Sequence, residues 1–171
     1  MQSKTNHSFK IKSLSEQGVF AGYASAYTLD AHHEVVERGA FQKNLTLMEA
    51  GQGMPKMLWQ HDPMQPIGRW EKIVENDQGL YVEGRLFLEL PKAQEAYILV
   101  KEGVVDGLSI GFEVVRSKKM PNHRLLQEIK LHEISLVTFP ANTQARVQTV
   151  KQISDIDCLI RQIDKLKGAM A

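Results

Sequence analysis

The feature that most constrains the fold is a pair of long apolar segments, at about 106–117 and 124–138, joined by a turn at 121–122. Val, Ile, Leu and Phe dominate both segments and turn residues separate them, which predicts two long strands. A second hairpin is predicted within 66–90, where Asn-Asp-Gln-Gly at 76–79 provides the turn. Hairpins connect antiparallel strands, so we expect most of the sheet to be antiparallel.

Shorter elements account for much of the remaining chain. Residues 37–53 and 90–104 carry apolar side chains at helical spacing and end at glycines, which predicts two helices. A short apolar strand ends at His61, and Asp62 with Pro63 is expected to form the turn after it. Strands with interspersed helices predict the α+β class, as a mainly antiparallel β-barrel or strongly curved sheet with packed helices.

Ser109 is the first candidate for chemistry, because it lies between Gly107 and Gly111 in the sequence GLSIG. Gly-x-Ser-x-Gly is the nucleophile elbow of α/β-hydrolases, which needs a strand before the serine and a helix after it. Here a predicted helix precedes Ser109 and a strand follows it, so that fold is rejected. The flanking glycines remove side-chain bulk, which would let a substrate backbone approach. A small hydroxyl tolerated in a sheet is the structural alternative.

A serine nucleophile needs a base, and His61 is the strongest candidate among six histidines. It ends an apolar strand, from which it could project into a cleft; a histidine bonded to its own turn is the structural alternative. The third group, which orients the imidazole, would be His132 or Glu133. Adjacent strand residues face opposite ways, so only one of them can join the site. The apolar residues around them do not decide which one, because both faces look partly buried.

The composition excludes several classes of function. The 21 basic and 20 acidic residues give a net charge of +1 without a basic stripe, which argues against binding of nucleic acid. A single cysteine, Cys158, excludes an intrachain disulfide and a cysteine-rich metal site, and fits a reducing compartment. Asp30, His32 and His33 are interpreted as solvated loop residues, so neither a metal nor a cofactor is expected. No apolar run approaches ~20 residues, so we expect a soluble protein without a signal peptide.

Four ordered blocks of sequence resemble one known family. The blocks are GYASAY…D…EVVERGAF at 22–41, LWQHD…PIGR at 58–69, GVVDGLSIGFEV at 103–114 and HEISLVTFPAN at 132–142. In this order and spacing they resemble the prohead serine proteases of tailed phages, which are related in fold to the herpesvirus assembly protease, assemblin. The resemblance covers most of the chain, about 9–147.

The resemblance implies a serine endopeptidase with an assemblin-like fold, in which Ser109 is the nucleophile and His61 the general base. It favours Glu133 as the third member, with His132 as the runner-up because assemblin uses a second histidine in a comparable place. The oxyanion and substrate region is expected around the flanking glycines and the loop after residue 138, with these candidates: Gly107, Gly111 and Arg146.

The resemblance also implies partners and a location. The substrate would be the precursor of the major capsid protein or a scaffold protein, cut inside the assembling procapsid in the host bacterial cytoplasm, together with the protease itself. Assemblin-like enzymes are dimers, so a homodimer is expected, whereas nucleic acid and membranes are not expected as partners. The alternative function is a catalytically silent capsid-assembly or scaffold protein on the same fold.

The chain is expected to divide into a protease domain at 1–150 and a C-terminal amphipathic helix at 151–171. Isoleucines at 153, 156, 160 and 163 form one apolar face of this helix. That face could pack on the domain itself or lie at an oligomer interface.

Overall fold

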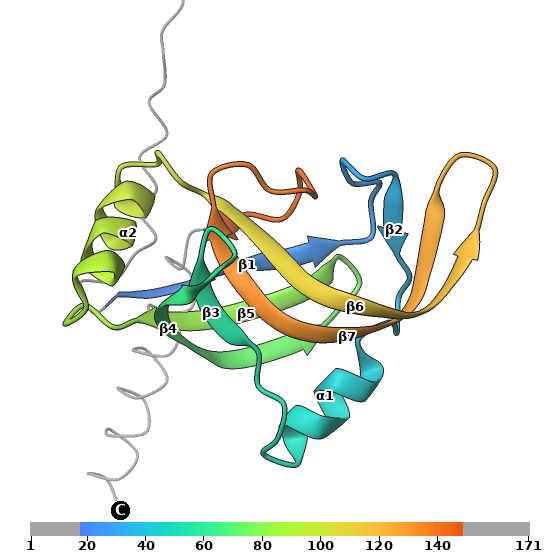
Figure 1. Cartoon of the computed structure of the whole chain (residues 1–171), viewed down its shortest axis with the longest axis horizontal. Coiled ribbons are helices and arrows are strands. Elements are labelled where there is room, and N and C mark those ends of the chain that lie inside the picture. Colours follow the sequence, from blue (N-terminus) through green and yellow to red (C-terminus); the bar gives the residue numbers. More distant parts are fainter. Residues whose placement is uncertain (1–17, 149–171) are drawn as a thin grey trace, which may run out of the picture.

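A computed structural model describes residues 18–148, which form eight strands and two helices (Figure 1). The strands are β1 (Val19–Ala26), β2 (Glu34–Val36), β3 (Lys56–Trp59), β4 (Asp62–Glu75), β5 (Gly79–Leu86), β6 (Gly107–Lys119), β7 (Arg124–Val137) and β8 (Val147–Gln148). The helices are α1 (Gln42–Glu49) and α2 (Pro91–Lys101).

One strongly curved sheet contains these strands, in the order β2-β7-β3-β4-β5-β1-β8, with β6 paired to β7. Its edges are linked near the start of β6, where the N–H of Leu108 donates to the carbonyl of Ala145 and the N–H of Val147 donates to that of Asp106. The prediction of an α+β fold with a mainly antiparallel, curved sheet is confirmed. The parallel pairing of β2 and β3 with β7 was not predicted.

Most predicted elements form close to their expected positions, and two points differ. The hairpins are β4–β5 and β6–β7, as expected. The turn after β3 was wrongly placed, because Asp62 and Pro63 belong to β4 and the turn consists of Gln60 and His61. Strand β2 forms within a stretch interpreted as a loop. The predicted C-terminal helix at 151–171 lies outside the described residues.

The hairpin of β6 and β7 contains a β-bulge beside the candidate residues. Gly111 pairs with Glu133, but the next residue of β6, Phe112, pairs with Leu131, so His132 is an extra residue in β7. A bulge of this kind shifts the alternation of side chains by one position. Leu131 and Ile134 lie on either side of the bulge, and their positions differ by an odd number of residues. In a regular strand they would face opposite ways, but here both are buried in the core.

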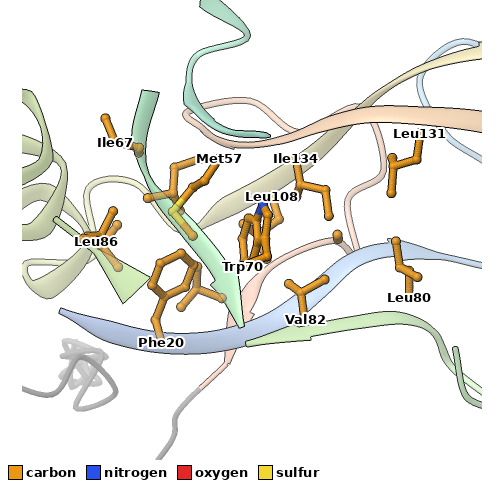
Figure 2. Packing of buried hydrophobic residues seen from close by; sticks show 14 of the residues in the cluster. Phe20, Met57, Ile67, Trp70, Leu80, Val82, Leu86, Leu108, Leu131 and Ile134 are labelled. Atoms are coloured by element: carbon orange, nitrogen blue, oxygen red, sulfur yellow. The ribbon is translucent and has the colours of Figure 1, made fainter. Parts of the chain in front are cut away.

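The core fills the concave side of the sheet, where side chains from β1, β3, β4, β5, β6 and β7 interdigitate (Figure 2). Phe20 and Trp70 pack edge to face with ring centroids 5.6 Å apart, an arrangement that aromatic quadrupoles favour. Met57 and Leu108 are at most 1% exposed. The residues just before His61 and Ser109 are therefore held by a densely packed interior.

The helices cover the ends of the sheet and are short. In α2, the helical spacing predicts a buried stripe of Ala93, Ala96, Tyr97 and Val100; Tyr97 is partly buried and the other three are fully buried. In α1, the buried amide of Asn44 donates to the carbonyl of Ile129 and accepts the N–H of Leu131, each at 2.8 Å. This fastens α1 to β7 directly before the bulge. Within 18–148, neither helix has the length and apolar character that crossing a membrane requires.

Candidate active site

His61 lies in a strained two-residue turn between β3 and β4. Trp59 pairs with Asp62, and the two residues between them, Gln60 and His61, have φ values of 54° and 60°. Positive φ at both central positions is the geometry of a type I′ hairpin turn, which favours Asn and Gly. For other residues the left-handed conformation costs roughly 1–2 kcal/mol each. Strain of this kind persists where the surrounding structure holds the residue in place.

Gln60 supplies part of that support through its side chain. Its Nε2 donates to Thr138 Oγ1 at 2.8 Å, and its Oε1 accepts the N–H of Thr138 at 3.2 Å. Its own N–H donates to the carbonyl of Leu136 at 2.9 Å. These three bonds attach the turn, and with it His61, to the end of β7.

Glu133 orients the imidazole of His61. The distance from His61 Nδ1 to Glu133 Oε1 is 2.5 Å, and the carboxylate side chain is 12% exposed. This hydrogen bond raises the pKa of His61 above its ordinary value; burial acts in the opposite direction, and the negative charge of Glu133 adds to the rise. With Nδ1 bonded to the carboxylate, the neutral ring carries its free lone pair on Nε2, as a general base requires.

Ser135 is a partner of this pair that the sequence analysis missed. Its hydroxyl is fully buried, donates to Glu133 Oε2 at 2.7 Å and accepts the backbone N–H of His61 at 3.2 Å. Both carboxylate oxygens of Glu133 are therefore bonded, and the same serine holds the backbone of the histidine. The sequence signal for Ser135 was its position two residues after Glu133, on the same face of a strand.

Ser109 lies on the same face of the sheet, directly opposite Ser135 in the pairing of β6 with β7. The residue is 7% exposed. It lines a cavity of about 660 Å³ that His61 also lines. Among the described residues, neither Ser109 Oγ nor His61 Nε2 has a hydrogen-bond partner. Catalytic hydrogen bonds are often long in a free enzyme and tighten when substrate binds.

The two glycines beside Ser109 make room for the protein itself. A Cβ at Gly111 would lie 2.2 Å from Glu133 Oε1, so the missing side chain leaves the space that the carboxylate occupies. A Cβ at Gly107 would lie 2.6 Å from the carbonyl oxygen of Val137 and 2.7 Å from the ring of Pro140. Close approach by a substrate was the expected reason for both glycines, whereas the observed contacts of both positions are internal.

Neither His132 nor Arg146 lines the cavity of Ser109 and His61. His132, in the bulge, is half exposed, and its Nε2 lies 3.9 Å from Glu113 Oε2. The guanidinium of Arg146 is bound to Asp106 Oδ1 at 2.5 Å and to the carbonyl of Thr143 at 3.0 Å. Arg146 and Gly107 do not line the cavity of Ser109, whereas Gly111 does.

Comparison with known proteins identifies the family. The sequence model of the Caudovirus prohead serine protease family matches residues 7–157. The chain belongs to this family. Over 149 residues it is 32% identical to the prohead protease of Enterobacteria phage HK97, a match that covers 84% of this chain and 65% of that protein. It therefore spans about two thirds of the length of that prohead protease.

A second relative is a much longer protein, which this chain matches over part of its length. The chain is 32% identical over 162 residues to the capsid polyprotein of Pseudomonas phage PAJU2, which covers 88% of this chain and 23% of the polyprotein.

Solved structures show the same fold at low identity. The capsid assembly protease of bacteriophage T4 matches with a TM-score of 0.53 at 14% identity, over 70% of this chain and 81% of that one. KSHV protease, solved with a hexapeptide phosphonate inhibitor, matches with a TM-score of 0.52 at 13% identity, over 75% and 63%. The expected likeness in fold between prohead proteases and a herpesvirus protease is confirmed for this member of the family.

Asp30 and His32, which were interpreted as solvated loop residues, line the cavity of Ser109. Within 18–148, no three His, Cys, Asp or Glu side chains are grouped closely enough to bind an ion. Glu34, at the start of β2, lines the same cavity. There Asp30 Oδ1 accepts the N–H groups of His32 and Glu34, so this carboxylate shapes its own loop.

Proposed function

We propose that the protein is a serine endopeptidase in which Ser109 is the nucleophile, His61 the general base and Glu133 the group that orients His61. The observation that carries the proposal is the joint arrangement of the three residues. Ser109 and His61 line one cavity, and Glu133 holds the far nitrogen of the imidazole at 2.5 Å. A catalytically silent assembly protein would have no need of a histidine held in a strained turn by a buried carboxylate.

The chemistry proceeds through an acyl-enzyme. Ser109 Oγ attacks the scissile carbonyl carbon while its proton passes to His61 Nε2, and the carbonyl becomes an oxyanion. The tetrahedral intermediate collapses as His61 gives that proton to the nitrogen of the leaving amine; the C–N bond breaks, the carbonyl re-forms, and the acyl group stays on Ser109 Oγ. Water then attacks the acyl carbon as His61 takes its proton, and the bond from that carbon to Ser109 Oγ breaks as His61 returns the proton to Oγ, which releases the acid and regenerates Ser109. Glu133 stays ionised and stabilises the imidazolium in both halves.

The loop after β7 is our candidate for the oxyanion donors. Ala141 and Asn142 line the cavity of Ser109, and their backbone N–H groups donate to no residue within 18–148. Backbone N–H groups aimed at the developing charge are the usual donors, and removing one donor costs ~3–4 kcal/mol of transition-state stabilisation. Gly107, Gly111 and Arg146 were the expected candidates for this region; the guanidinium of Arg146 is already engaged elsewhere.

The proposed substrate is a capsid precursor or scaffold protein, cut inside the assembling procapsid in the host cytoplasm, along with the protease itself. The names of the relatives support this assignment, because one is a prohead protease and another is a capsid polyprotein. We also propose that the chain acts as a homodimer, in which the predicted helix at 151–171 is a candidate interface.

The test is co-expression of the full chain with its cognate capsid precursor. Wild type should convert the precursor to a shorter product, whereas Ser109→Ala and His61→Ala should leave it intact. Glu133→Gln should lower processing strongly and His132→Ala should leave it close to wild type. Processing that persists in both Ser109→Ala and His61→Ala would refute the serine mechanism, and the reverse order of Glu133→Gln and His132→Ala would make His132 the third member.

A further inference from the structure

Phe139 is the most exposed large apolar side chain among the described residues, with 90% of its surface open to solvent. Exposed apolar surface of this size gains free energy when a partner covers it. Phe139 lies in the loop after β7 and lines the cavity that contains Ser109 and His61. Its exposure is therefore located at the mouth of the proposed catalytic cavity.

The backbone on both sides of Phe139 is firmly held. Before it, Thr138 is bonded through its N–H and its hydroxyl to the side chain of Gln60. After it, the carbonyl of Ala141 accepts the N–H of Ala31, and the amide of Asn142 donates to the carbonyls of β1 and the following loop. In Figure 1 this orange-red loop and the blue β1–β2 connection lie on the same side of the sheet. The ring is thus presented from a fixed loop.

The rest of the cavity favours an apolar occupant over a charged one. Ile110 and Phe112 line it beside Ser109 and are partly buried. The two carboxylates at its rim already have partners, since Asp30 accepts backbone N–H groups and Glu34 accepts Arg124 Nη1 at 3.1 Å. A basic side chain of the substrate would have to compete with these internal bonds, whereas an apolar one would cover surface that is now exposed.

We propose that Phe139 forms a specificity subsite for a bulky aliphatic or aromatic side chain of the substrate peptide, close to the scissile bond. The inference rests on the proposed peptidase function and adds the chemical class of the residue that the substrate must carry. Thr138, the neighbour of Phe139, is bonded to Gln60 in the turn that contains His61, so the subsite is physically connected to the general base. Phe139 acts through contact with the substrate and takes no part in proton transfer.

The test is cleavage of a defined library of 14-residue peptides by the full chain, with the products identified by mass spectrometry. Wild type should prefer Leu, Ile, Met or Phe over Ala at one fixed position relative to the cut, by about 10-fold or more. Phe139→Ala should abolish this preference, because cleavage of the Leu, Ile, Met and Phe peptides should fall to the level of the Ala-containing peptides. Phe87→Ala is the matched control, because Phe87 is a partly exposed phenylalanine outside the cavity, and it should retain the preference.

Two results would overturn the subsite. One is a Phe139→Ala variant with an unchanged preference, and the other is an equal loss of cleavage for all peptides. If wild type cleaves no peptide, the peptidase function itself fails, and retention of the same library on immobilised Ser109→Ala protein still tests the subsite. Apolar-containing peptides should then be retained by Ser109→Ala and lost from Ser109→Ala/Phe139→Ala. If both immobilised proteins retain the apolar-containing peptides equally, the subsite is refuted. If the protein is a dimer that becomes monomeric only when Phe139 is removed, the ring belongs to a dimer interface and the subsite is likewise refuted.

Discussion

Adding a single methyl group at Gly111 should disable the site without disturbing the core. The Cβ of Gly111→Ala would lie 2.2 Å from Glu133 Oε1, 2.8 Å from its Cδ and 2.9 Å from its Cγ. Ordinary contacts begin near 3.4 Å, so the carboxylate oxygen must retreat by about 1.2 Å, the difference between the two distances. The nearest atoms belong to a side chain that can move, so β6 and β7 should remain paired.

That retreat is large compared with the bond that it disrupts. The contact between His61 Nδ1 and Glu133 Oε1 is 2.5 Å, and a displacement of this size takes it beyond hydrogen-bond length. Converting the orienting aspartate to asparagine in a serine protease triad lowers kcat by about 10⁴. A displaced but still ionised carboxylate should cost less, about 10²–10³ in kcat/KM, which corresponds to about 2.7–4 kcal/mol.

The assay combines processing of the cognate capsid precursor with thermal unfolding and a pH profile. Gly111→Ala should lower kcat/KM. The rise of kcat/KM with increasing pH should also occur at lower pH than in wild type, since the bond to Glu133 raises the pKa of His61. Gly84→Ala is the matched control, because its Cβ would lie 2.4 Å from Met57 Cε in the core. It should lower Tm and leave the pH profile of the folded fraction unchanged.

A double-mutant cycle isolates the proposed collision. In a Glu133→Ala background the carboxylate is absent, so Gly111→Ala should change the residual kcat/KM by less than about 2-fold. The reasoning is refuted if Gly111→Ala keeps wild-type activity and pH dependence, or if it costs as much with Glu133 removed as with Glu133 present.

Further substitutions test the other contacts of the site. In Glu133→Gln, the rise of kcat/KM with pH should occur at lower pH than in wild type, because the bond to Glu133 raises the pKa of His61. The stability that the His61–Glu133 pair contributes is present below the unfolded-state pKa of His61 and is lost as pH rises through the raised folded-state pKa. The denaturant midpoints of wild type and Glu133→Gln should therefore converge in alkaline solution. Ser135→Ala should lower the free energy of unfolding by about 1–3 kcal/mol, because it leaves a buried carboxylate oxygen without its donor, and an unchanged urea midpoint would contradict this. His61→Gly and His61→Ala should both abolish activity, but His61→Gly should have the higher free energy of unfolding of the two, by about 1 kcal/mol, since glycine accepts a φ of 60°; an equal or lower urea midpoint for His61→Gly than for His61→Ala would count against strain at this turn.

Much of the fold could be read from local patterns. Turn residues between apolar segments located both long hairpins, and the spacing of Ala93, Ala96 and Val100 located the buried face of α2. The pairing of β2 and β3 with β7 could not be read in this way, because parallel pairing joins segments far apart in the sequence and leaves no turn between them. The turn after β3 was misplaced for a related reason: Gln60 and His61 have poor turn propensity, and contacts from β7 force them into it.

The site was predicted in its residue types and left open in its geometry. The sequence indicated Ser109 and His61, and the family resemblance favoured Glu133 as the third member, with His132 as the runner-up. Strand alternation could not choose between them, because the bulge at His132 shifts the alternation and no local pattern reveals it. The bulge and the bonds of Asn44 to β7 turn Glu133 toward His61 and leave His132 half exposed.

By itself, then, the sequence determined most of the elements, the class of fold, the family and the chemical groups that could act as nucleophile and base. Only the tertiary structure decided whether Glu133 or His132 holds His61, why Gly111 lacks a side chain and how Ser135 and Gln60 support the site. These features depend on contacts between strands that are distant in sequence, such as the 2.5 Å bond from the β3–β4 turn to β7. Local periodicity records which face a residue occupies, whereas such contacts depend on register, bulges and curvature, which packing of the whole sheet sets.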